Sequence, residues 1–394
     1  MTVVESAIQE TGGTPLAILR DICRFDSGGT PDRANSDFYG GTTPWISGAD
    51  IAPDGRLSPR SQITELALTR SAARVVGPGT ILLVTRTSVG KVAIAPYPVS
   101  FSQDITAITP SPEALDTSYL VEFLKSQQDY FTGNARGATI KGITRDVVRN
   151  LSIPLPRLPE QRRIAAILDK ADRLRAQRRE ALAHLDALTQ SIFNDMFVLN
   201  LNTFTEVHDL GNVCDFYAGS SLRGGESWTG QDHGFLQLKV SDMNRRGNEV
   251  QIRGAALWSG KPGAKSATLP AGSIIFPKRG ASIATNKKRT VMRPAVLDPN
   301  LMGITPRASV DIYYLHHWFE KFDLTSLSSG SSVPQLNKKD LFPVQIPVPP
   351  LELQQTFARR VAGVERLKEQ HRTQLAELDT LFESLQHRAF RGEL

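Results

Sequence analysis

The most constraining feature of this 394-residue chain is that it repeats itself once. Cys23 returns as Cys214 after 191 residues, while Gly79 and Pro154 have their counterparts 193 residues further along. The units of a solenoid repeat every 20 to 50 residues or so, and a period this long therefore indicates a duplicated domain. Each copy ends in an Ile-Pro-x-Pro run that leads into a long helical pattern. The chain therefore predicts two similar globular heads and two similar long helices.

Short apolar runs broken by Gly, Pro, Asn and Asp predict heads of the α+β class, as mixed α/β globules. The clearest strand pair is 80–85 with 91–95, and residues 117–131 show helical spacing with Thr117 as a possible N-cap. Residues 312–322 match this helix in the second copy. We divide the chain into head 1 (1–157), a first long helix (158–199), head 2 (200–349) and a second long helix (350–394).

Both long helices carry an apolar residue at every third or fourth position, which is the heptad pattern of a coiled coil. Because one helix cannot bury such a stripe alone, we expect the two helices to form an antiparallel coiled coil with one head at each end. Arg178, Lys368 and His371 interrupt the pattern, and polar seam residues can fix register. The alternative is that each helix packs on its own head. The predicted seam residues are Ile164, Ile167, Leu174, Leu185, Leu188, Ile192, Val361, Val364, Leu375, Leu378, Phe382 and Leu385.

The charge balance favours a polyanionic partner, because the net charge is +6 and the isoelectric point is near 9.3. The two cysteines stand at equivalent repeat positions, and we expect each to be a small buried residue. The seven histidines show no metal-ligand spacing, which predicts no metal site. No apolar run reaches the length of a membrane span and no signal sequence begins the chain. We therefore expect a cytoplasmic protein with no membrane partner.

Motifs that carry chemistry are missing from the sequence. It has no phosphate-binding glycine loop, no nucleophile elbow and no Asn/Asp-Pro-Pro-aromatic tetrad to hold a flipped adenine, which predicts a chain without catalysis of its own.

Basic loops recur instead at one position of the repeat. Arg86 and Lys91 flank the turn after the first strand, and Lys278 and Arg279 follow the matching run in the second copy. Such side chains beside Ser and Thr suit phosphate contacts and base-edge readout, although an ordinary solvated surface is the alternative. The predicted DNA-binding residues are Thr85, Arg86, Ser88, Lys91, Arg136, Lys141, Lys278, Arg279, Lys287, Lys288 and Arg289.

Three motifs stand at the junction of head 1 and the first long helix: Gly137-Ala138-Thr139-Ile140-Lys141-Gly142-Ile143, Leu151-Ser152-Ile153-Pro154-Leu155-Pro156 and Leu158-Pro159-Glu160-Gln161-Arg162-Arg163-Ile164. Together they resemble the motifs of type I restriction–modification specificity subunits. The loops 84–91 and 102–105 are also similar to that family. The second copy matches more loosely, with Gly330-Ser331-Ser332-Val333, Leu336, 346–350 and Gln354, and it departs where Leu353 replaces Glu160. The resemblance extends over about residues 16–390.

The resemblance implies a non-catalytic subunit that reads double-stranded DNA. Each head would be a target recognition domain for one half of a bipartite, asymmetric target, and the helices would dock two adenine-N6 methyltransferase subunits. It implies no cofactor in this chain, S-adenosylmethionine in the methyltransferases, and ATP and Mg in two motor-nuclease subunits. The alternatives are a stand-alone DNA-binding or adaptor protein of another defence system, or a coiled-coil scaffold that binds protein.

Overall fold

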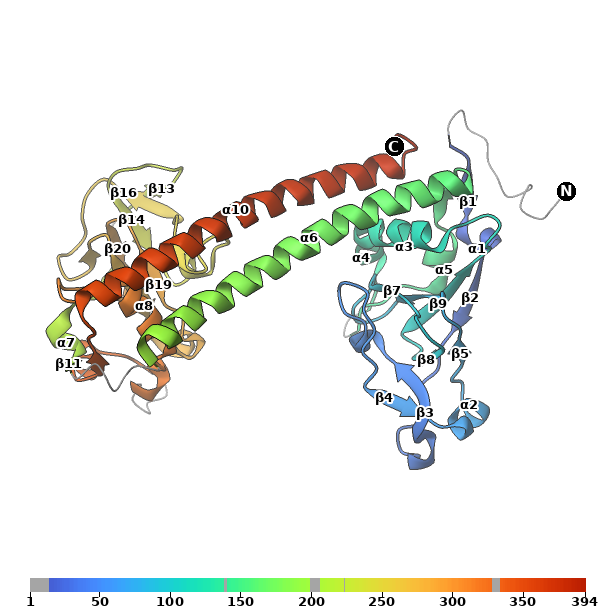
Figure 1. Cartoon of the computed structure of the whole chain (residues 1–394), viewed down its shortest axis with the longest axis horizontal. Coiled ribbons are helices and arrows are strands. Elements are labelled where there is room, and N and C mark those ends of the chain that lie inside the picture. The colour runs from blue at the N-terminus through green and yellow to red at the C-terminus, as the bar shows by residue number, and fades with distance from the viewer. Residues whose placement is uncertain (1–13, 138–139, 199–205, 223, 328–333) are drawn as a thin grey trace. The chain divides into compact units, whose positions relative to one another are not determined.

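A computed structural model describes residues 14–137, 140–198, 206–222, 224–327 and 334–394 of the chain (Figure 1). The chain divides into two compact units. Unit 1 comprises residues 1–179 and 373–394, and unit 2 comprises residues 180–372. Each unit therefore contains one head together with one part of each long helix.

Head 1 is built on two four-stranded sheets and one short strand pair. The first sheet has the order β2 (Cys23–Ser27), β9 (Ile105–Pro110), β6 (Ile81–Val84) and β7 (Val92–Ile94), and the second has the order β4 (Ser61–Ile63), β3 (Tyr39–Ile46), β8 (Val99–Phe101) and β5 (Val75–Val76). β1 (Leu16–Ile18) pairs with β10 (Ser152–Pro154). The helices are α1 (Leu19–Ile22), α2 (Glu65–Arg70), α3 (Thr117–Ser126), α4 (Gln128–Asn134) and α5 (Arg145–Arg149). The predicted hairpin is confirmed, because β6 and β7 pair antiparallel.

The predicted helix over 117–131 is two helices in the structure. α3 ends at Ser126 and α4 begins at Gln128. The N-cap is Asp116 rather than Thr117, because the Asp116 carboxylate accepts hydrogen bonds from the backbone N–H groups of Ser118 and Tyr119. A carboxylate at this position also interacts favourably with the positive end of the helix dipole.

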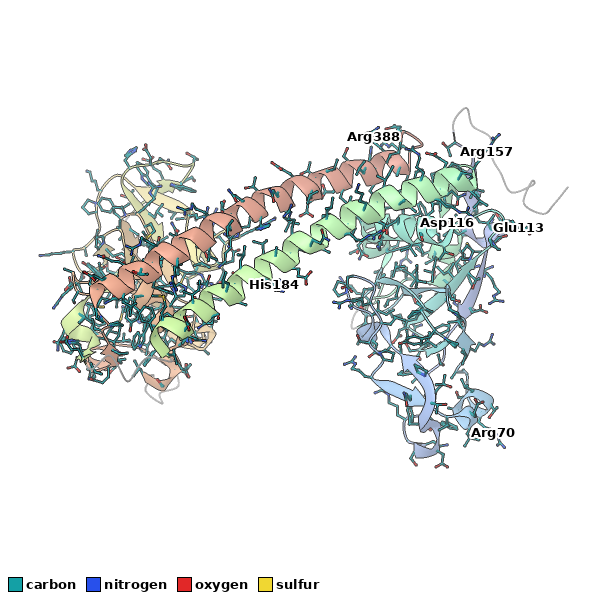
Figure 2. All side chains as sticks on the ribbon, viewed as in Figure 1. Arg70, Glu113, Asp116, Arg157, His184 and Arg388 are labelled. Carbon is teal, nitrogen blue, oxygen red and sulfur yellow. The ribbon has the colours of Figure 1, made fainter. Side chains whose placement is uncertain are left out.

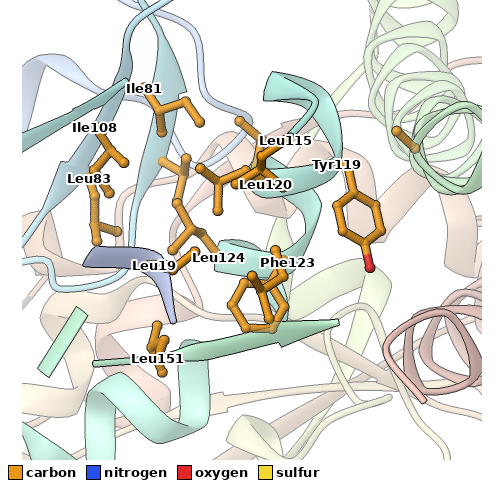
Figure 3. Close-up of a cluster of buried hydrophobic side chains, with 14 of the residues drawn as sticks. Leu19, Ile81, Leu83, Ile108, Leu115, Tyr119, Leu120, Phe123, Leu124 and Leu151 are labelled. Carbon is orange, nitrogen blue, oxygen red and sulfur yellow. The ribbon is translucent and has the colours of Figure 1, made fainter. Parts of the chain in front are cut away.

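The core of unit 1 lies where α3 packs on the first sheet (Figure 3). Leu120 and Leu124 of α3 are fully buried and belong to one cluster with Ile81 and Ile108 of the sheet. Tyr119 is also buried, and its hydroxyl donates to the Pro154 carbonyl at 2.9 Å. This bond ties α3 to the proline-rich strand that leads into the long helix.

Head 2 repeats this plan, but each of its two sheets has five strands instead of four. The first has the order β12 (Cys214–Ala218), β21 (Leu301–Pro306), β18 (Ser273–Pro277), β19 (Arg289–Val291) and β15 (Gln251–Ile252), and the second has the order β13 (Glu226–Ser227), β16 (Leu257–Ser259), β14 (Phe235–Leu238), β20 (Ala295–Leu297) and β17 (Thr268–Leu269). β11 (Val207–Asp209) pairs with β22 (Gln345–Pro347), and the helices are α7 (Leu210–Val213), α8 (Ile312–Lys321) and α9 (Lys338–Leu341). The second sheet of each head contains one parallel strand pair, β3 with β8 in head 1 and β14 with β20 in head 2, so the duplication extends to the sheet topology.

The two long helices are α6 (Leu158–Phe193) and α10 (Leu351–Ala389), and they pack antiparallel. In unit 1, Ile164 and Leu168 of α6 share a buried cluster with Phe382 and Ala389 of α10. In unit 2, Phe193 shares another with Phe357 and Val361. Figure 2 shows Arg157, just before α6, and Arg388, close to the last residue of α10, at the same end of this helix pair. The predicted antiparallel arrangement is confirmed.

Burial of the predicted seam residues differs between the two helices. Val361, Val364 and Phe382 are buried, whereas Leu174 is 39% exposed and Leu188 is 44% exposed. The remaining predicted positions are buried or half-buried: Ile164, Ile167, Leu185, Ile192, Leu375, Leu378 and Leu385. At the interface, each of these leucines is replaced by the next residue in the sequence, Arg175 after Leu174 and Thr189 after Leu188. Likewise Leu168, the residue after Ile167, is fully buried.

The polar seam residues have partners that explain this one-residue correction. Arg175 bonds Asp379 of α10 at 2.6 Å and Asp172 of its own helix at 2.9 Å. Its guanidinium also lies 4.3 Å from the centre of the Phe382 ring. A paired cation over an aromatic face can occupy a seam position that an isolated cation could not.

One repeat later the same arrangement recurs in unit 2. Lys368, which is 4% exposed, bonds Asp186 of α6 at 2.8 Å and Glu365 of its own helix at 2.7 Å. Its ammonium lies 3.5 Å from the hydroxyl of Thr189. Each unit therefore contains a cation that joins the two helices, half-buried Arg175 in unit 1 and buried Lys368 in unit 2. Lys368 lies between the helices, as the interrupted heptad pattern predicts.

Candidate nucleic-acid interface

Three exposed cations of head 1 are gathered by backbone pairing around Gly142. Arg86 and Arg136 each form a bridge with Gly142, and Arg136 and Gly142 exchange backbone hydrogen bonds of 2.8 and 3.0 Å. The Thr87 N–H donates to the carbonyl of Lys141 at 3.0 Å. Arg86, Arg136 and Lys141 are all exposed. The structure therefore places three of the predicted DNA-binding residues on one surface.

The backbone at this surface requires small or turn-forming residues. Thr87 has a φ of +68° and Gly90 a φ of +92°, both in the left-handed region. A Cβ atom on Gly142 would lie 2.9 Å from the Arg86 side chain and 3.1 Å from the Thr85 carbonyl oxygen. Gly142 thus allows the two strands of the loop to approach closely.

Head 2 builds the equivalent surface around Arg279. Arg279 forms a bridge with Gln335, and the backbone N–H of Leu336 donates to the Lys278 carbonyl at 2.9 Å. The N–H of Gly280 donates to the Pro334 carbonyl at 2.8 Å. Arg279 is exposed, as Arg86 is in head 1. The motif residues Ala138, Thr139 and Gly330-Ser331-Ser332-Val333 lie outside the described residues.

Several predicted DNA-binding residues do not reach this kind of surface. Thr85 is 5% exposed and its hydroxyl donates to the Asp104 carbonyl. Lys91 is half-buried and its ammonium donates to the carbonyl of Ile51 at 2.9 Å, while Ser88 is half-buried in the turn. For Thr85 and Lys91 these internal bonds replace the predicted DNA contact.

The lysines of head 2 need the same correction. Lys278 is 8% exposed and Lys288 is 2% exposed. The Lys288 ammonium donates to the Phe322 carbonyl and lies 5.2 Å from the centre of the Phe319 ring. Burial lowers the pKa of Lys288 to about 8. Both lysines are buried in head 2, and burial of this degree is incompatible with gripping a phosphate.

In addition to Arg279, head 2 has two predicted cations that are half-buried, Lys287 and Arg289. The Lys287 ammonium donates to the side chain of Asn244. Arg289 is half-buried, and among the described residues its Nε has no hydrogen-bond partner. The two heads therefore present related but unequal basic surfaces.

One group of side chains could hold a metal ion within the described part of the chain. His316, His317 and Glu320 of α8 bring three ligand atoms within 4.8 Å of one another, and the buried Nε2 of His316 has no hydrogen-bond partner there. The charges of Lys288 and Arg289 oppose a dication at this place. Burial, followed by these two cations, lowers the pKa of His316 to about 4. We therefore interpret the group as neutral histidines beside a carboxylate that balances the lysine and arginine.

The cysteines are not candidates for a site either. Both are free, Cys214 is buried and Cys23 is half-buried. Burial raises the pKa of each thiol to about 12, which keeps both protonated and unreactive.

The glutamines of the family-like motif have a structural role. Gln161 is fully buried at the start of α6, where its side chain accepts from the Asp116 N–H at 2.8 Å and donates to the carbonyls of Ala114 and Pro156. Gln354 makes the equivalent bonds with residues of head 2 at the start of α10. Each amide fixes the first turn of a long helix to the head that precedes it.

Comparison with known proteins identifies what these two surfaces belong to. A family model described as the type I restriction modification DNA specificity domain matches the chain twice, over residues 18–184 and 206–380. The chain belongs to the family of type I restriction–modification specificity subunits. A specificity subunit is itself non-catalytic, which agrees with the motif analysis. This membership decides against the protein scaffold and against the adaptor of another defence system.

Individual relatives support the same assignment over most of the chain. This specificity subunit is 25% identical to the type I restriction enzyme MjaIX specificity subunit of Methanocaldococcus jannaschii, over 86% of this chain and 84% of that one. It is 31% identical to the EcoR124I/EcoR124II specificity subunit of Escherichia coli over 40% of each chain. The crystal structure of an S subunit from M. genitalium has the same fold, with a TM-score of 0.63, 16% identity and coverage of 97% and 98%. None of the helices in the described ranges has the length and apolar composition to cross a bilayer.

Proposed function

We propose that the two heads of this specificity subunit read the two unequal halves of a bipartite DNA target, one half-site per head. The observation that carries the proposal is the repeated basic loop, Arg86 beside Gly142 in head 1 and Arg279 beside Gln335 in head 2. An arginine on a loop braced from both sides can donate two hydrogen bonds to guanine or to a phosphate. Because the surrounding side chains differ between the heads, the two half-sites should differ as well.

We further propose that the subunit works in a complex with two adenine-N6 methyltransferase subunits. The helices are duplicated along with the heads, and a duplicated surface suits two identical partners. The methyltransferases would supply S-adenosylmethionine, and two motor-nuclease subunits with ATP and Mg would join for restriction. A solved structure with a TM-score of 0.58 to this chain comes from work on complex assembly of the type I system, which supports assembly of this subunit into such a complex. Because the target is genomic DNA, we place the complex in the cytoplasm.

The test of the first proposal is charge reversal in one head at a time. Arg86→Glu should weaken binding to duplexes through one half-site and Arg279→Glu through the other, each by about 1–3 kcal/mol or roughly 5- to 150-fold. Arg70→Glu is the matched control, because Arg70 is an exposed arginine of head 1 on α2, away from the Gly142 loop. Binding that both reversals leave unchanged on every duplex would refute the loop assignment.

The second proposal is tested by co-expression with the host adenine methyltransferase. We expect a complex of one specificity subunit with two methyltransferases whose DNA affinity falls steeply with salt, because phosphate contacts release counterions. A chain that purifies alone and binds DNA alone would contradict it.

A further inference from the structure

Four exposed leucines on the long helices occupy two positions of the repeat, one in each copy. Leu174 and Leu188 of α6 are 39% and 44% exposed, and Leu367 and Leu381 of α10 are 48% and 49% exposed. Leu174 matches Leu367 and Leu188 matches Leu381, each at the 193-residue offset. A single exposed leucine needs no explanation, but the same exposure at both copies of two positions indicates a shared use.

Within unit 1, the contacts of Arg175 bring Leu174 and Leu381 to the same layer of the helix pair. Leu174 directly precedes Arg175, and Leu381 directly precedes Phe382, over whose ring the Arg175 guanidinium lies. In an antiparallel pair, residues that precede facing seam residues lie along the same edge of the interface. The two leucines therefore form one apolar patch beside a polar seam layer.

Unit 2 contains the equivalent patch. Leu188 directly precedes Thr189, and Leu367 directly precedes Lys368, whose ammonium is 3.5 Å from the Thr189 hydroxyl. The layer beside this patch is again polar, with Lys368 bonded to Asp186. In each layer the seam position between the helices is occupied by a cation paired with an aspartate of the other helix, and the leucines stand beside it.

The charges beside the patches are also related by the repeat. Arg173 precedes Leu174 and Arg366 precedes Leu367, and both arginines are exposed. A surface that fits both patches would offer an apolar socket with a carboxylate near its rim. The surfaces of the two heads differ, so a partner that binds both units alike must use a feature that the units share.

We propose that the Leu174–Leu381 patch and the Leu188–Leu367 patch are two equivalent docking points, each for one copy of the same methyltransferase subunit. This inference rests on the proposed function and deepens it, because it assigns one copy of the partner to each patch. Two identical partners on one chain require two equivalent surfaces, and these patches are equivalent in residue type, exposure and neighbouring seam layer. Burying two exposed leucines at one interface strengthens binding, so losing a pair should remove its copy.

The test replaces one patch at a time in the co-expressed complex and measures stoichiometry by native mass spectrometry. Leu174→Asp with Leu381→Asp should change the complex from two methyltransferases to one, and Leu188→Asp with Leu367→Asp should do the same. All four changes together should release both copies. Leu66→Asp is the control, since Leu66 of α2 is 41% exposed and lies in head 1. The alanine versions of both pairs serve if an aspartate version fails to fold.

The outcomes separate this inference from the proposal beneath it. Double variants that are folded and still bind two methyltransferases at wild-type affinity would overturn the leucine assignment alone. A wild-type chain that binds no methyltransferase would overturn both. Loss of one copy from each double variant, with both retained by Leu66→Asp, is the result that we expect.

Discussion

Truncation of two leucines on the same helix tests the corrected seam most sharply. Leu168 is fully buried in the cluster of unit 1, whereas Leu174 is 39% exposed on the same stretch of α6. A buried leucine cut to alanine loses its transfer free energy and leaves a cavity, which costs about 3–5 kcal/mol. The Leu174 side chain buries less apolar surface, and alanine has the higher helix propensity. Leu174→Ala should therefore cost about 1 kcal/mol or less.

Both variants can be followed through one reporter of unit 1. Trp45 is the only tryptophan in residues 1–179 and 373–394, it is 5% exposed, and its indole N–H donates to the Gly29 carbonyl. With 5-fluorotryptophan, its ¹⁹F resonance can be followed through a urea titration. If the slope is about 2 kcal/mol per molar urea, Leu168→Ala should lower the midpoint by about 1.5–2.5 M and Leu174→Ala by less than about 0.5 M. Equal shifts, or a larger shift for Leu174→Ala, would refute the corrected seam.

Three further predictions follow from buried polar groups. Gln161→Ala should destabilise unit 1 by about 2 kcal/mol, seen as a lower Tm, because it leaves three backbone partners unsatisfied; an unchanged Tm would contradict this role. Lys368→Met should change stability by less than about 1 kcal/mol, whereas removing both Asp186 and Glu365 should cost about 3 kcal/mol, and the reverse order in urea titrations would be evidence against a paired buried cation. Because burial lowers the pKa of His316 to about 4, the unfolded chain binds the extra proton between pH 6.5 and 4, and unit 2 should lose up to about 3 kcal/mol across that range. His316→Asn should flatten the difference in urea midpoints between pH 7 and pH 5, and an equally steep loss in that variant would assign the effect elsewhere.

Much of the architecture is predictable from the sequence because the repeat and the heptads are local patterns. The β6–β7 hairpin, the helix at 312–322 and the α10 seam through Val361, Val364 and Phe382 agree with the structure. The α6 seam is harder, because two apolar stripes run side by side on that helix. Choosing between Leu174 and Arg175 requires knowing that Asp379 and Phe382 lie opposite, and this is a property of the packed pair.

The sequence predicts where the candidate interface lies, but not which of the basic residues are exposed there. The basic loop recurs at one repeat offset, which places Arg86 and Arg279 correctly on exposed loops. The pattern gives no warning that Lys288 is buried, since its partners are the Phe322 carbonyl and the Phe319 ring, more than 30 residues away in sequence. The one available signal was the neighbouring sequence, in which Thr290 and Val291 continue as a buried strand.

The most direct test of the central claim, two unlike heads that read two unlike half-sites, is single-molecule methylation mapping of the host genome with and without this gene. We expect N6-methyladenine to disappear from one bipartite, asymmetric motif when the gene is deleted, and Arg86→Glu and Arg279→Glu to relax opposite halves of that motif. A continuous or palindromic motif, or a methylation pattern that the deletion leaves intact, would contradict it.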